Sequence, residues 1–202
     1  MEQKQRILSK INRSKKGTIF MPDSFMPIDT RHAANVLAEF SRMGKLTRVA
    51  FGIYVKPKES RFGKVMPTLQ EIAEAIAKRD AAQLLPHGAT AENYLGFSTQ
   101  VPMNPIYLTS GTYRKIKVGK RTLTLQHRAP GTFAYKGKIM PILVLALQSI
   151  GRDNLTDEVR AIAAGIVKKH PETKTWQADI SHAPNWIRVM IMNIKKTYNE
   201  MD

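Results

Sequence analysis

The first part of the chain, residues 1–56, alternates short apolar stripes with polar and basic segments. Asp29 and Thr30 are good N-cap residues and Gly44 is a good C-terminal stop, so they delimit a predicted helix. Within it, apolar side chains recur at the three- and four-residue spacing of one helix face, namely Ala33, Val36, Leu37, Phe40 and Met43. The segment as a whole predicts the order helix, short helix, amphipathic helix and two-stranded ribbon.

The remainder of the chain mixes helical and strand patterns. Residues 57–67 are basic and hold two prolines, so they predict a linker. Thr68 and Glu71 then form a capping box at the start of an amphipathic helix. Residues 114–125 alternate apolar and basic positions as a hairpin does, and residues 140–150 are apolar nearly all round, as in a buried helix.

These patterns predict an α/β (α+β) fold in two parts. The element order of residues 1–56 is the order that a winged helix-turn-helix needs. Residues 57–67 form the predicted basic linker, and residues 68–202 a mixed domain with a small antiparallel sheet and several C-terminal helices.

Charge indicates the class of partner. The 202 residues include 32 Lys+Arg and 16 Asp+Glu, a net charge of +16. Residues 1–66 carry 14 basic and 5 acidic side chains, whereas residues 151–202 carry 8 and 7. A folded protein with so one-sided a charge is typical of nucleic-acid binding, and charge that only aids solubility is the alternative.

Apolar runs in the sequence are short. The first ten residues lack the apolar stretch of a signal peptide, and residues 140–147 fall far short of the ~18 residues of a membrane span. We therefore expect a soluble, cytoplasmic protein with no membrane partner.

A winged helix-turn-helix places its third helix in the major groove of double-stranded DNA. Arginine suits the edge of guanine and asparagine that of adenine, while basic residues of a wing suit phosphates. The alternative is a three-helix subdomain with an ordinary solvated face. The predicted DNA contacts are Thr30, Arg31, His32, Asn35 and Arg42 on the helix, Arg48 in the ribbon and Lys56 after it.

The hairpin of residues 114–125 is a second basic segment without an acidic residue. Its alternation predicts an apolar face and a basic face. The basic face could follow a phosphate backbone, dock on an acidic protein surface, or protect an edge strand from aggregation. The predicted contacts of this segment are Arg114, Lys115, Lys117, Lys120, Arg121 and Arg128.

The sequence holds no recognisable set of catalytic residues. The chain has no cysteine, no nucleophile elbow and no phosphate-binding loop, and its five histidines are scattered without a carboxylate cluster. The spacing of Arg121 and His127 occurs in some ribonuclease motifs, but there it lies on a helix, whereas this segment predicts a strand. We therefore expect no enzyme activity, no catalytic residue, no metal and no cofactor.

Residues 44–54, GKLTRVAFGIY, resemble the wing pattern G-x-L-x-R-V-x-x-G-x-Y of the AbiEi-type antitoxins of type IV toxin–antitoxin systems. The likeness continues through residues 108–125, LTSGTYRKIKVGKRTLTL, and covers roughly residues 3–150. The resemblance implies an N-terminal winged helix that represses its own promoter. It also implies a C-terminal region that counters a cognate nucleotidyltransferase toxin.

Other functions remain open at this point. One is a winged-helix transcriptional regulator that senses a small ligand and has no toxin partner. Another is a structural protein that binds nucleic acid, and a third is an enzyme that acts on it. A neighbouring gene for a nucleotidyltransferase would favour the antitoxin.

Overall fold

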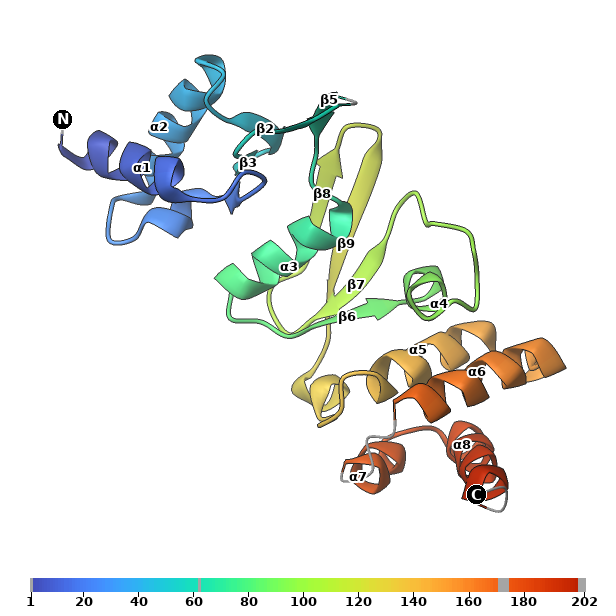
Figure 1. The fold of residues 1–202 in the computed structure, drawn as a ribbon. Helices are drawn as coiled ribbons and strands as arrows, with labels where there is room; N and C mark the ends of the chain where they lie inside the picture. The colour runs from blue at the N-terminus through green and yellow to red at the C-terminus, as the bar shows by residue number, and fades with distance from the viewer. Residues whose placement is uncertain (1, 62, 171–174, 200–202) are drawn as a thin grey trace. The chain divides into compact units, whose positions relative to one another are not determined.

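The computed structural model describes residues 2–61, 63–170 and 175–199 (Figure 1). In these residues the protein is a mixed α+β structure that divides into two compact units. The first unit consists of Met1–Ala82 and Lys115–Leu123, and the second of Gln83–Arg114 and Thr124–Asp202. Each unit is therefore built from two separate stretches of the chain.

The first unit begins with the predicted helices and ribbon, in the predicted order, and adds a short strand, β1 (Ile19–Phe20), that was not predicted. The elements are α1 (Glu2–Arg13), β1, the 3-10 helix η1 (Pro22–Phe25), α2 (Thr30–Arg42), β2 (Thr47–Ala50) and β3 (Ile53–Val55). The three strands form an antiparallel sheet in the order β1-β3-β2.

α2 buries the predicted apolar stripe and thereby joins α1 to this sheet. Leu37 and Phe40 are almost fully buried, and burying a side chain of this size stabilises the fold by about 1.5–3 kcal/mol. The prediction for Met43 is wrong: this residue is the C-cap of α2, beyond the buried face, and is 57% exposed. The core cluster consists of Ile7, Ile11, Phe20, Phe25, Ala33, Val36, Leu37, Phe40, Leu46 and Tyr54.

The segment expected to be a linker contains a short hairpin. β4 (Lys58–Ser60) and β5 (Gly63–Val65) pair in antiparallel register, and their described side chains are exposed. α3 (Leu69–Arg79) follows and begins at the predicted capping box, in which the Glu71 N–H donates to Thr68 Oγ1 at 3.1 Å. The first compact unit thus continues past residues 57–67.

A four-stranded sheet has the strand order β6-β7-β9-β8. Its strands are β6 (Leu84–His87), β7 (Ile106–Thr109), β8 (Arg114–Val118) and β9 (Arg121–His127), and α4 (Ala89–Leu95) follows β6. The sheet is mixed rather than purely antiparallel, because β7 and β9 pair in parallel. β6 was not predicted, and its Pro86 is tolerated because β6 is an edge strand.

The second unit ends in helices that share one core cluster. After η2 (Pro130–Phe133) come α5 (Met140–Ile150), η3 (Arg152–Asn154), α6 (Asp157–Lys169), α7 (Trp176–Ser181) and α8 (Asn185–Asn199). Leu143 of α5, Val167 of α6 and Ile187 of α8 meet in this cluster, and Trp176 of α7 is buried in it. No helix in the described part of the chain has both the length and the apolar character to cross a membrane.

α3 ends in a motif that normally requires glycine. The Ala82 N–H donates to the Ala77 carbonyl at 2.8 Å and the Ala81 N–H to the Lys78 carbonyl at 3.3 Å, which is the Schellman pattern. Ala81 occupies the left-handed position of this motif with φ +49°. A β-carbon in that conformation costs about 1–2 kcal/mol.

We expect Ala81→Gly to raise the free energy of unfolding by about 1 kcal/mol, because glycine removes this strain. Urea and thermal unfolding of the full chain measure the change. Ala75→Gly in the interior of α3 is the matched control and should lower stability by about 0.5–1 kcal/mol. A loss of stability in both variants would contradict strain at Ala81.

Candidate nucleic-acid interface

The start of α2 is fixed by a side-chain cap. Asp29 Oδ1 accepts a hydrogen bond from the backbone N–H of His32 at 2.8 Å, so the helix begins at Thr30. Arg31, Asn35 and Arg42 are exposed and lie four and seven residues apart, which places them on one stripe opposite the buried face. His32 is exposed beside them. The 13 residues of α2 therefore present one polar, cationic side to solvent.

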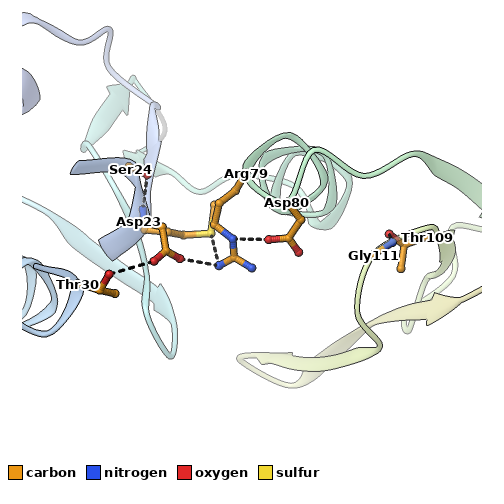
Figure 2. A network of polar contacts seen from close by, with 8 residues as sticks. Asp23, Ser24, Thr30, Arg79, Asp80, Thr109 and Gly111 are labelled. Carbon is orange, nitrogen blue, oxygen red and sulfur yellow. Dashed lines mark hydrogen bonds and ion pairs between the residues drawn. The ribbon is translucent and has the colours of Figure 1, made fainter. Parts of the chain in front are cut away.

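A polar network lies immediately before α2 (Figure 2). The Thr30 hydroxyl donates to Asp23 Oδ1 at 3.4 Å, and Asp23 Oδ2 lies 3.6 Å from Arg79 Nη1. Arg79 Nε also donates to Asp80 Oδ1 at 2.7 Å. The hydroxyl of Thr30, which was expected to contact DNA, therefore donates to a carboxylate within the protein. Through the Arg79–Asp23 ion pair, the end of α3 also contacts η1, the 3-10 helix that precedes α2.

The only acidic residue of α2 has a cationic partner. Lys4 Nζ on α1 lies 2.5 Å from Glu39 Oε1, and this hydrogen bond is the main cause that lowers the pKa of Glu39. Glu39 is thus ionised and paired with Lys4, and weaker attractions to Arg42 and Lys45 also lower its pKa.

The β2–β3 turn carries an aromatic side chain that the sequence reasoning missed. Phe51 is 91% exposed, and the Arg48 guanidinium lies 5.4 Å from the centre of its ring. An exposed ring beside a guanidinium can stack on a nucleotide base or insert between base steps. The sequence did contain a signal for this exposed ring, because Phe51 stands next to Gly52 in the turn predicted between two strands.

Lys56 has a different role from the phosphate contact that the sequence predicts. Its ammonium donates to the carbonyls of Ile11 at 2.9 Å, Asn12 at 2.8 Å and Ser14 at 2.7 Å. These carbonyls lie at the C-terminal end of α1, where a cation also interacts favourably with the helix dipole. All three N–H donors of the ammonium are engaged there, which leaves none for a phosphate.

The predicted alternation of the basic hairpin is confirmed in β8 and β9. Lys115, Lys117 and Lys120 are exposed, and they belong to the same compact unit as α2. Arg114 and Arg121 are half-buried. Arg128 is also half-buried and donates to the His127 carbonyl at 3.1 Å, so it is partly engaged within the second unit.

Positive charge is concentrated in the first unit. Its sequence holds 20 basic and 8 acidic side chains, a net charge of +12 out of the +16 of the whole chain. The structure thus adds the tip of the β8–β9 hairpin to the basic residues of the first 66 positions. A charge of this size creates a potential that attracts polyanions.

The described residues contain no group of three or more His, Asp or Glu side chains that could hold a metal ion. Arg121 and His127 lie on one strand, β9, as the alternation predicts. His127 Nδ1 lies 2.8 Å from the Gly111 carbonyl, so this ring nitrogen is engaged with the backbone.

The fold and the site define a mixed α+β protein with most of its net positive charge in one compact unit. The chain belongs to DUF6088, a family of unknown function, whose model matches residues 6–175. No curated protein matches the chain.

We expect Lys56→Ala to lower the free energy of unfolding by about 2 kcal/mol, because it leaves three carbonyls at and just beyond the C-terminal end of α1 without a charged donor. Urea unfolding measures the loss. Lys58→Ala, a nearby exposed lysine on β4, is the matched control and should change stability by less than about 0.5 kcal/mol. Similar values for both variants would show that the Lys56 hydrogen bonds contribute little.

Proposed function

We propose that this protein is a winged-helix DNA-binding protein that represses its own promoter. The observation that carries the proposal is the element order α1-β1-η1-α2-β2-β3 with the sheet order β1-β3-β2, combined with an exposed cationic stripe on α2. In this assignment η1 and α2 form the helix-turn-helix, α2 enters the major groove, and β2–β3 is the wing.

The exposed polar and basic residues then make two kinds of contact, with base edges and with phosphates. Arg31 and Asn35, in the first turns of α2, read base edges, because the N-terminal residues of a recognition helix reach the floor of the groove. Arg48 binds phosphate at the wing. Lys115, Lys117 and Lys120 add further phosphate contacts, which strengthen binding without regard to sequence.

The second part of the proposal is that the protein is the antitoxin of a type IV toxin–antitoxin system. It is supported by the resemblance of residues 44–54 and 108–125 to the AbiEi-type family. The uneven charge also supports a division of labour, since residues 151–202 carry a net charge of only +1. Such a region suits a protein partner, here a nucleotidyltransferase toxin, better than it suits DNA.

The DNA-binding proposal is tested on the promoter DNA and on a random duplex of equal length. We expect Arg31→Ala and Asn35→Ala each to reduce discrimination between the two by about 1–3 kcal/mol, because each removes a base contact. Arg48→Ala should weaken binding to both duplexes by the same factor, because a phosphate contact carries no sequence information. Fluorescence anisotropy at fixed salt measures the affinities.

The matched control is Arg6→Ala, which removes an exposed arginine of α1 that is paired with Glu2. It should bind both duplexes as the native protein does. Equal losses for Arg31→Ala and Arg48→Ala on both duplexes would contradict base reading by α2. Failure of the native protein to prefer the promoter would contradict autorepression.

The antitoxin proposal is tested by co-expression with the nucleotidyltransferase toxin that the proposal requires. We expect the double variant R31A/R48A to lose repression of a promoter reporter and still to protect cells, because neutralisation lies outside the DNA-binding face. The variant keeps the chain whole, so protection does not depend on the folding of a fragment. Loss of both activities in a folded double variant would contradict the claim that repression and neutralisation use separate surfaces. Failure of the native protein to protect cells would contradict the proposal that it is an antitoxin.

A further inference from the structure

A cavity of about 390 Å³ lies within the second unit, between the start of β6, the segment after η2 and the first turn of α5. Its apolar side is formed by Leu84, Leu85, Phe133 and Ile142. Binding pockets for small molecules have volumes of about 300–1,000 Å³, so the cavity has room for a small ligand and is too small for a helix of another protein.

The wall of this cavity is held by a buried carboxylate. Asp179 of α7 is 0% exposed and accepts hydrogen bonds from the backbone N–H groups of Lys136 and Gly137, both at 2.7 Å. Each carboxylate oxygen therefore has a donor, and the 136–137 backbone is fixed in place. A wall that is ordered before a ligand arrives lowers the entropic cost of binding.

Tyr135 adds a polar group to the same wall. Its ring lies edge-on to His182, with 5.6 Å between the ring centres, and both Tyr135 and Lys136 line the cavity. Burial, with a further contribution from the Asp179 charge, raises the pKa of Tyr135. A phenol is protonated at neutral pH, so the Tyr135 hydroxyl is a hydrogen-bond donor among the residues that line the cavity.

The charged residues that line the cavity are cationic, whereas the Asp179 carboxylate is not among the lining residues and is bound to the N–H groups of Lys136 and Gly137. Lys136 and Lys138 line the cavity, and none of its lining residues is acidic. α5 begins at the cavity with Pro141 and Ile142 in its first turn, and its N-cap, Ile139, provides no capping side chain. The positive end of a helix dipole thus reinforces the two ammonium groups.

We propose that this cavity binds a small organic anion: a carboxylate with an aromatic or branched apolar body. The body packs against Leu84, Leu85 and Phe133, and the carboxylate faces Lys136 and the first turn of α5. This site is separate from the residues assigned to DNA binding, and its existence does not depend on that assignment.

The test uses 2-naphthoate as the probe and its neutral analogue 2-naphthamide as the control ligand, titrated into the full-length protein by calorimetry. The two probes share one apolar body and differ in charge. We expect 2-naphthoate to bind with a stoichiometry of one and about tenfold more tightly than the amide, a difference that corresponds to about 1.4 kcal/mol. Equal binding of both, or binding of neither, would overturn the proposal.

Two variants locate the site. Lys136→Glu should weaken 2-naphthoate about tenfold and leave the amide unchanged, whereas Lys169→Glu, an exposed lysine at the end of α6, should alter neither. Leu84→Trp should fill the cavity and abolish binding of both probes. Full affinity in Lys136→Glu, or in a folded Leu84→Trp, would place the probe elsewhere and overturn the proposal.

Amide chemical shifts of the native protein provide a measurement that does not depend on the folding of a variant. On addition of 2-naphthoate we expect changes centred on the N–H groups of Leu85, Tyr135 and Gly137. Changes confined to other residues would overturn the proposal.

Discussion

The ammonium group of Lys56 joins the end of the β1-β3-β2 sheet to the end of α1 in the N-terminal part of the first unit. It lies one residue after β3 and binds three carbonyls at the end of α1, more than 40 positions earlier in the chain. The Lys56 backbone continues this connection, since its N–H donates to the Thr18 carbonyl and its carbonyl accepts from the Gly17 N–H, both at 2.9 Å. Because α1 and the sheet are joined there, the buried stripe of α2 packs against both of them in one core cluster. The exposed face of α2 is therefore set by contacts made on its opposite side.

Much of the fold could be predicted because local chemistry and burial agree. The Asp29 cap and the apolar stripe behind it define α2, and the Thr68–Glu71 capping box defines the start of α3. β4 and β5 could not be predicted, because their described side chains are exposed and leave no apolar alternation. β6 was missed because Pro86 interrupts the strand pattern, and only the sheet order shows that it lies at an edge.

The candidate site was predictable only as far as exposure follows helical periodicity. Arg31, His32 and Asn35 are exposed as predicted, because their neighbours on α2 are buried. The role of Lys56 depends on carbonyls distant in sequence, which no local pattern reveals. The position of Phe51 is the reverse case: its type favours a core position, and only the tight turn forces it into solvent.

The β8–β9 hairpin has a base in the second unit and a tip in the first. The chain consequently passes between the units three times, at Ala82–Gln83, Arg114–Lys115 and Leu123–Thr124. A single proteolytic cut releases neither unit whole, and no contiguous gene segment encodes either one. Exchange of the first unit between relatives by recombination would therefore have to carry the hairpin tip with it.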